Sequence, residues 1–125
     1  MPTPIDELTN EELATAIAEM MGCQKIFAEL TWFWEFPDKS LVRIADWNPY
    51  SSWADFGVVV EWMEAEPRGW ESEHYSWGHE GADWYWWDFR SSPIRKVYAT
   101  DPDIRTASLK AGLKAQGGDG EKVDA

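Results

Sequence analysis

The stretch ADWYWWDFR, residues 82–90, brings five aromatic rings and two carboxylates together and decides the fold of this 125-residue chain. Successive residues of a strand point to opposite faces, so the stretch predicts two rows of side chains: Trp84, Trp86 and Asp88 on one side, and Tyr85, Trp87 and Phe89 on the other. The stretch GWESEHYSW, residues 69–77, has the pattern of a partner strand, and the glycines between the two stretches predict a hairpin turn. Helices on both faces of such a sheet would bury both rows, whereas helices on one face would leave one row for a partner.

The first third of the chain predicts a helix followed by two strands. The helix begins after Thr9, which can form a capping box with Glu12. Residues 24–36, QKIFAELTWFWEF, alternate at strand spacing and predict one continuous strand. One face of that strand would carry Ile26, Ala28, Leu30, Trp32, Trp34 and Phe36. The turn PDKS then predicts that residues 41–47 return as its partner.

Two further segments predict helices. The segment that follows NPY is capped by Ser51 or Ser52, and Ser52 has Asp55 three residues further on, as a capping relation requires. The last segment, DPDIRTASLKAGLKAQ, begins with Asp101 as its cap and Pro102 in its first turn. One face of this last helix consists of small residues, which allows it to lie close to a sheet.

The order of helices and strands predicts an α+β fold, with a mainly antiparallel sheet layered with helices. Residues 8–116 are expected to form a single domain. Residues 1–7 and the glycine-containing residues 117–125 are expected to be flexible ends.

Three segments resemble the phage α-β-α sandwich domain family of small bacteriophage proteins. They are ELATAIAEMMGC (12–23), PYSSWADFGVVVEWME (49–64) and IRTASLKAGLKA (104–115). The resemblance implies a phage origin and an α-β-α sandwich, and it implies no reaction. The sequence departs from the family pattern at Cys23, where an aromatic residue is usual after Met-Gly, and in its closing helix, which lacks a long alanine run.

The net charge of −12, from 23 acidic and 11 basic residues, opposes binding to nucleic acid or to anionic lipid. The same charge favours docking onto a basic protein surface, although solubility alone also explains it. The single cysteine excludes an internal disulfide and indicates a reducing compartment. The sequence has no stretch of ~18 apolar residues and no signal-peptide pattern, so the expected location is the cytoplasm of a host cell.

A metal site would have to come from the hairpin, where His74 and His79 lie beside Glu73 and Glu80. The two histidines differ in strand parity and point to opposite faces. A zinc site also requires more ligands at a recognisable spacing. We therefore expect no metal and no cofactor.

Paired carboxylates beside stacked rings are the groups that a glycoside hydrolase uses. Glu71 and Glu73 share a strand face, and Asp83 and Asp88 flank the rings. Chance pairs are common among 23 acidic residues, and no nucleophile motif accompanies these. Cys23 follows the end of a helix, where the helix dipole disfavours a thiolate, so it is expected to be a small buried residue. We predict a protein that is not an enzyme.

The cations are concentrated near the end of the chain, with six in residues 89–116 against two carboxylates. One interpretation is a nucleotide pocket, in which Trp84 and Trp86 stack on a base while Arg90 and Arg95 hold phosphate near the amides of the last helix. The other interpretation is that these cations balance the acidic half of the protein within the fold.

Ten tryptophans are difficult to bury in one small core, so some rings are expected at an interface. The function expected from the sequence is therefore binding without catalysis: a phage protein that inhibits a host protein, for example as a nucleic-acid mimic that blocks a defence nuclease (an anti-CRISPR type of activity). The alternatives are sequestration of a nucleotide-like molecule, or a virion accessory protein. A homo-oligomer is open under each of these functions. The residues expected to bind are Glu71, Glu73, Asp83, Trp84, Trp86, Asp88, Arg90 and Arg95.

Overall fold

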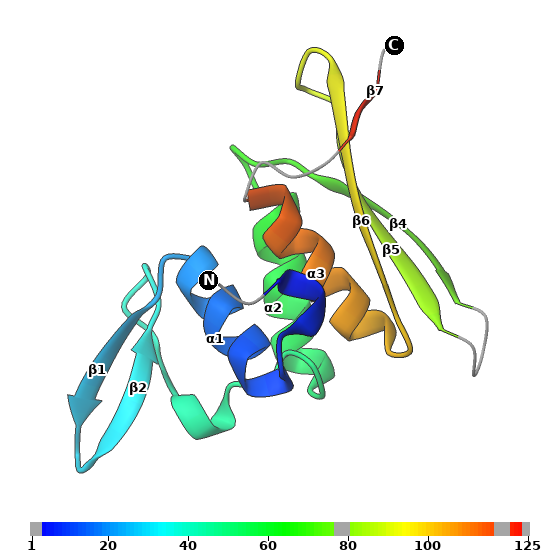
Figure 1. Cartoon of the computed structure of the whole chain (residues 1–125). Helices are drawn as coiled ribbons and strands as arrows, with labels where there is room; N and C mark the ends of the chain where they lie inside the picture. The colour runs from blue at the N-terminus through cyan, green and yellow to red at the C-terminus, as the bar shows by residue number, and fades with distance from the viewer. Residues whose placement is uncertain (1–3, 77–80, 117–120, 124–125) are drawn as a thin grey trace.

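The computed structural model describes residues 4–76, 81–116 and 121–123 (Figure 1). Its α-helices are α1 (Asn10–Met20), α2 (Trp53–Glu64) and α3 (Ile104–Gln116), and its 3-10 helices are η1 (Ile5–Glu7) and η2 (Ile44–Asp46). A first antiparallel sheet has the order β1 (Gln24–Ala28), β2 (Thr31–Glu35) and β3 (Leu41–Arg43). A second antiparallel sheet has the order β4 (Glu71–Ser76), β5 (Ala82–Asp88), β6 (Ile94–Asp101) and β7 (Glu121–Val123).

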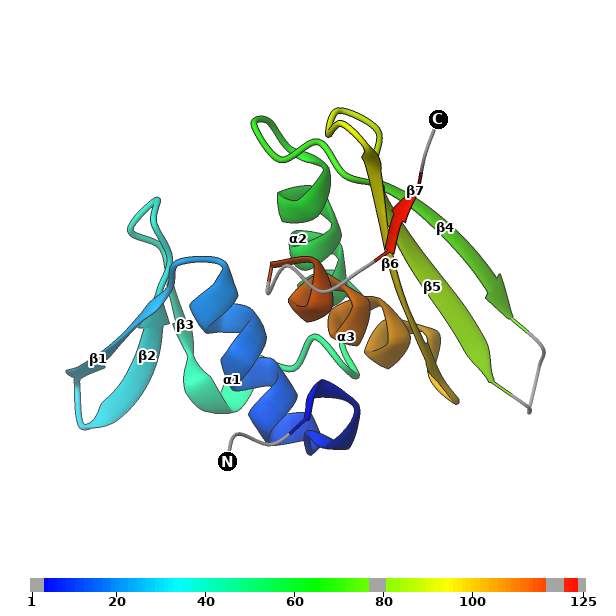
Figure 2. The same cartoon turned by 45° about the horizontal axis from the view of Figure 1, so that its top comes forward.

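The α+β class, with antiparallel sheets layered with helices, is confirmed. The three α-helices lie between the two sheets, so the layers follow the order sheet, helices, sheet (Figures 1 and 2). This order differs from the α-β-α order that the family resemblance implies, in which a sheet lies between helices. As a result, each sheet packs helices on one face only.

The predicted starts of the first two α-helices are confirmed. The Thr9 hydroxyl accepts a hydrogen bond from the backbone N–H of Glu12 at 3.2 Å, and the Thr9 N–H donates to the Glu12 carboxylate at 3.0 Å. This pair of bonds is a capping box. Ser52 caps α2, because its hydroxyl accepts from the N–H of Asp55 at 3.2 Å.

The expectation of one strand over residues 24–36 is wrong, because the chain reverses at Glu29 and Leu30 and forms the β1–β2 hairpin. Both turn residues have left-handed backbones, with φ of 50° and 67°, which is the geometry of a two-residue hairpin loop. The reversal also changes which residues share a face. Phe27 lies opposite Trp32 in the register, although uninterrupted alternation had placed these two rings on opposite sides.

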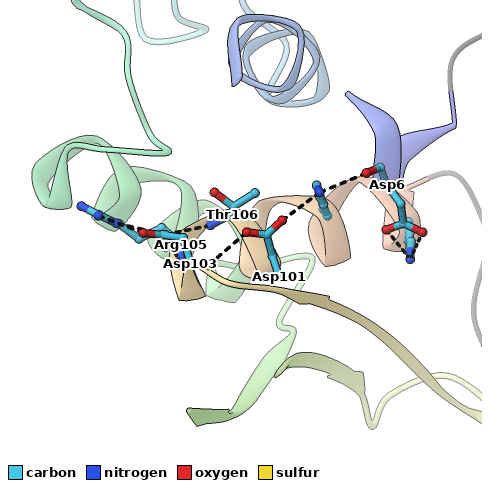
Figure 3. Close-up of polar contacts among 7 residues, drawn as sticks. Asp6, Asp101, Asp103, Arg105 and Thr106 are labelled. Carbon is cyan, nitrogen blue, oxygen red and sulfur yellow. Dashed lines mark hydrogen bonds and ion pairs between the residues drawn. The ribbon is translucent and has the colours of Figure 1, made fainter. Parts of the chain in front are cut away.

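The cap of α3 is Asp103 and not the predicted Asp101. The Asp103 carboxylate accepts from the backbone N–H groups of Arg105 at 2.8 Å and Thr106 at 3.3 Å (Figure 3). Asp101 ends β6 and forms an ion pair with Lys110 at 2.9 Å. The prediction failed because both aspartates precede the helix, and the extra strand residues before Asp103 were not recognised.

Two strands of the second sheet were not predicted. Strand β6 occupies residues 94–101, of which the sequence analysis assigned only Asp101, as a helix cap, and β7 lies within the segment expected to be a flexible tail. Strand β7 pairs antiparallel with β6. At the other end, η1 lies within the segment 1–7, and Asp6 forms an ion pair with Lys114 of α3 at 3.1 Å. Both ends of the chain therefore contribute described contacts to the fold.

Helix α3 packs against the inner face of the second sheet, beside β5 and β6. Its contact face is built from small residues, as expected, and Ala107, Ala111 and Ala115 are buried. Small side chains let the helix approach the large rings of β5 closely. The Trp86 indole N–H donates to the carbonyl of Ser108 at 3.3 Å and fixes this approach.

Candidate binding face

The outer face of the second sheet, here called the open face, is the side turned away from the helices (Figures 1 and 2). The register brings every second residue of three strands onto this side, because Glu73 pairs with Tyr85 and Tyr85 pairs with Tyr98. The side chains on this side include Glu71, Glu73, Tyr75, Asp83, Tyr85, Trp87, Lys96, Tyr98 and Thr100. Phe89, which follows β5, stacks on Trp87 at the end of the same face.

Aromatic rings form two contacting groups on the open face, and Lys96 lies between them. Tyr85 stacks on Tyr98 with a centroid distance of 5.3 Å and meets Tyr75 edge-on at 6.2 Å. Further along β5, Trp87 stacks on Phe89 at 5.4 Å. Tyr75, Tyr98 and Phe89 are exposed, and Tyr85 and Trp87 are half-buried. Rings in this state offer a large flat area to another molecule.

The open face also carries carboxylates and one lysine. The Lys96 ammonium lies 5.9 Å from the Tyr85 ring and 5.5 Å from the Trp87 ring, which is cation–π geometry. Asp83 accepts a hydrogen bond from the Thr100 hydroxyl. The pKa of the Tyr75 phenol is raised, first by the negative charge of Glu73 and then by partial burial and a hydrogen bond to Glu73. Tyr75 therefore stays protonated and neutral beside this carboxylate.

Trp84 and Trp86, which the sequence analysis placed in a binding site, lie in the core. They are 5% and 0% exposed, on the side of β5 that faces α3. The Trp84 ring stacks on the His74 ring at a centroid distance of 4.7 Å. The prediction that these two rings stack on a base is therefore wrong, because neither offers a free surface.

Arg90 and Arg95 do not form a phosphate clamp. Arg90 makes a two-pronged ion pair with Glu66, and this interaction raises the pKa of the guanidinium. Arg95 donates to the carbonyl of Ala115 at 3.2 Å and lies over the Trp70 ring at 5.5 Å. Both cations thus have partners within the fold, and Arg90 is balanced by a carboxylate, as the charge-balance interpretation expects.

Two lysines of α3 are paired with carboxylates (Figure 3). Lys110 contacts Asp101 at 2.9 Å, and Lys114 contacts Asp6 at 3.1 Å. The amides at the start of α3 are occupied by the Asp103 carboxylate. A phosphate would have to displace these contacts, so the geometry does not favour a nucleotide site here.

The four predicted carboxylates divide between the two sides of the hairpin. Glu71, Glu73 and Asp83 lie on the open face, each on a different pairing level of the sheet. Asp88 has the parity of the buried rings and accepts the backbone N–H of Arg90 at 3.1 Å in the following turn. Three of the eight predicted residues therefore meet on one surface, together with rings that the sequence analysis did not select.

The sequence analysis missed Tyr75, Tyr98 and Lys96 as components of this face. Tyr98 and Lys96 lie on β6, a strand that was not predicted. A sequence signal was present, because Val97 and Ala99 alternate with Tyr98 and Thr100, and the structure buries the first two and exposes the others. The run is short and begins directly after Pro93, and these features hid it.

Several other candidate sites are weaker. Of the four hairpin residues considered as metal ligands, His79 and Glu80 lie outside the described residues, and the described part of the chain holds no cluster of three or more metal-ligating side chains. A cavity of about 440 Å³ between α1 and η2 is lined by Trp34, Trp47 and Tyr50 among others, with Glu11 as its only charged lining residue. It offers no cation to a phosphate.

Cys23 is buried, as expected. Burial, followed by the negative charge of Asp38, raises the pKa of its thiol to about 11. The thiolate population is consequently very small near neutral pH, which does not suit a nucleophile.

The tryptophans divide between core and surface, as the sequence analysis expected. Those that are buried are Trp34, Trp47, Trp70, Trp84 and Trp86. Trp32 and Trp53 are exposed, and Trp53 lies under the Arg105 guanidinium at 4.5 Å. Rings therefore reach the surface on each of the two sheets and on α2.

Fold and site together define an α+β protein with an uncovered aromatic and acidic sheet face. The chain matches no protein-family model and no curated protein. None of the helices in the described ranges has the length and apolar character needed to cross a bilayer.

Proposed function

We propose that this chain is a non-catalytic binding protein that docks onto a basic surface of another protein through the open face. The observation that carries the proposal is the row of Tyr75, Tyr85 and Tyr98 on a sheet face that packs no described helix. Tyrosine is favoured at protein interfaces, because it supplies a large rigid contact area together with a polar hydroxyl group.

The chemistry of the face suits cationic side chains. Lys96 already rests on the rings of Tyr85 and Trp87, so these rings have faces on which an ammonium or guanidinium group can lie. Glu71 and Glu73 are exposed on the neighbouring strand and can pair with the same cations. A partner's arginine would gain both ring stacking and a carboxylate contact.

The charge of the whole molecule supports the same choice of partner. A net charge of −12 attracts a basic protein over a Debye length of about 8–10 Å and raises the rate of encounter. The basic groove of a nuclease, including a host defence nuclease, is a surface of this kind. Inhibition of such an enzyme by a phage protein is the specific form of the proposal.

Affinity capture from a bacterial lysate tests the proposal with matched variants. The wild-type chain and a Trp53→Ser control, which changes an exposed ring on α2, are expected to retain the same basic protein. A Tyr85→Ser/Tyr98→Ser variant is expected to lose it. The captured protein should also be released by high salt and by competing DNA. A partner that the double variant retains, or one that salt does not release, contradicts the proposal.

A further inference from the structure

The tip of the β1–β2 hairpin exposes a second apolar surface, remote from the open face. Phe27 is 58% exposed, Trp32 is 52% exposed, and their rings contact each other at 5.2 Å. Leu30, in the turn, is 92% exposed. The hairpin tip extends beyond α1 on the far side of the molecule from the second sheet (Figures 1 and 2). The monomer therefore uses these side chains very little in its own core.

The turn residue Leu30 is an unfavourable choice for a monomer. Its φ of 67° lies in the left-handed region, where glycine or asparagine is preferred and a branched apolar side chain is disfavoured. Burial in the monomer does not explain a leucine at this position either, because the side chain of Leu30 is almost fully exposed. Strain that the monomer does not need is a reason to look for a contact outside it.

The charge of the first sheet identifies what kind of molecule can approach it. Residues 24–43 carry three cations and three carboxylates and are neutral, whereas the whole chain has a net charge of −12. A second copy of this chain is repelled by most of the acidic surface. It meets the least repulsion at this neutral sheet, where a basic partner has no electrostatic reason to bind.

Strand β1 also has a free hydrogen-bonding edge. It is the first strand of the order β1-β2-β3, and within the described residues only β2 pairs with it. Every second residue of an edge strand directs its N–H and C=O groups away from the sheet. Such an edge is a template for another strand.

We propose that two copies of this chain associate by antiparallel pairing of their β1 strands, which joins the two first sheets into one continuous sheet. A twofold axis at Ile26 places Lys25 opposite Phe27 of the second copy and Gln24 opposite Ala28. An edge lysine usually prevents pairing, but in this register it meets an aromatic ring and not another lysine. On the other sheet face, Ile26 meets its own copy, flanked on each side by Phe33.

This association goes beyond the proposed function, because it uses none of the residues of the open face. The two surfaces also respond differently to salt. Salt weakens docking of an acidic face onto a basic partner, whereas it screens the repulsion between two copies of an acidic chain. Pairing through β1 should therefore persist or tighten as salt is raised.

Sedimentation equilibrium tests the proposal on the full chain, from about 1 µM to about 1 mM, a range that covers weak association. The expected result is a concentration-dependent shift from 14.4 kDa to twice that mass, retained at high salt. Ile26→Lys places two like charges at the axis and should abolish the dimer. Leu41→Lys, a change of an exposed apolar residue on the opposite edge strand, is the matched control and should leave the dimer intact.

Leu30→Gly provides a second variant that does not depend on the folding of Ile26→Lys. Glycine relieves the left-handed turn, so the melting temperature of the monomer should not fall. With the axis at Ile26, antiparallel pairing places the turn of one copy beside the residues that precede β1 in the other copy. Loss of the exposed leucine from that turn should therefore weaken dimerisation by about tenfold, the equivalent of about 1.4 kcal/mol. A chain that stays monomeric at every concentration overturns the proposal. Sensitivity to Leu41→Lys with no sensitivity to Ile26→Lys or Leu30→Gly also overturns it.

Discussion

Truncation of a ring on the inner face of the second sheet should destabilise the protein far more than truncation of a ring on the open face. Trp86 is 0% exposed, so Trp86→Ala removes about 150–250 Å² of buried ring surface. At about 25 cal/mol per Å², this loss corresponds to about 4–6 kcal/mol. The Ser108 carbonyl also loses the indole N–H that donates to it at 3.3 Å. This loss is a large part of the free energy of unfolding of a typical domain, which is about 5–15 kcal/mol.

Tyr98→Thr is the matched change on the open face. Tyr98 is 46% exposed, and a cross-strand ring pair contributes roughly 0.2–1 kcal/mol. The expected cost is therefore about 1–2 kcal/mol, since about half of the ring is already in water. Threonine keeps the β-propensity of the strand, so the comparison isolates the ring.

Urea unfolding followed by circular dichroism measures the free energy of unfolding of both variants. The melting temperature should fall by roughly 3–5 °C per kcal/mol lost, for a chain of this length. If Trp86→Ala does not fold, Trp86→Phe retains a ring and should still cost about 1–3 kcal/mol through the smaller side chain and the lost donor. Equal costs for the Trp86 and Tyr98 variants would refute the reasoning, because the open face would then be packed like the core.

Two further predictions concern titratable groups. Burial acts to raise the pKa of Asp103, but hydrogen bonds from Arg105 and from the N–H groups of Thr106 and Arg105 outweigh it, and the net pKa is lowered. A lowered folded-state pKa stabilises the fold above the unfolded value of about 3.9, and this contribution is lost as the pH falls through the folded value. Asp103→Ala should therefore cost about 0.5–2 kcal/mol at pH 7 and progressively less below about pH 4 in urea titrations; a cost that is independent of pH contradicts the capping role. The Cys23 thiol, with its pKa raised to about 11 by burial and by Asp38, should react with an aromatic disulfide reagent at pH 8 far more slowly in the folded protein than in urea, and equal rates would show that the thiol is accessible.

The elements with strong local signals were predictable from the sequence. The caps at Thr9 and Ser52 use side-chain to backbone bonds that span three residues, so neighbouring sequence determines them. The hairpin of β4 and β5 and the two ring rows of β5 follow from alternation alone. The split of residues 24–36 into two strands was missed, because Glu29 and Leu30 lack the asparagine or glycine that usually marks a tight turn.

The candidate site was only partly predictable. Strand parity separates Trp84 and Trp86 from Tyr85 and Trp87, but it does not say which row faces α3. The sequence analysis placed the binding rings on the buried row, and the structure places exposed rings on the other one. The ion pair of Arg90 with Glu66 joins residues 24 positions apart. No local sequence pattern predicts a contact over this separation.

The α+β class, the helix starts at two caps and the period of the β5 rings could be read from the amino-acid sequence, because each depends on interactions between residues a few positions apart. The position of all three α-helices between the sheets, and the exposure of Tyr75, Tyr85 and Tyr98, depend on long-range packing. The physical reason is that a strand with rings on both faces has two sides that are almost equally apolar. The choice between them is made by the small-residue face of α3, which fits closely against Trp86 and leaves the opposite row in contact with solvent.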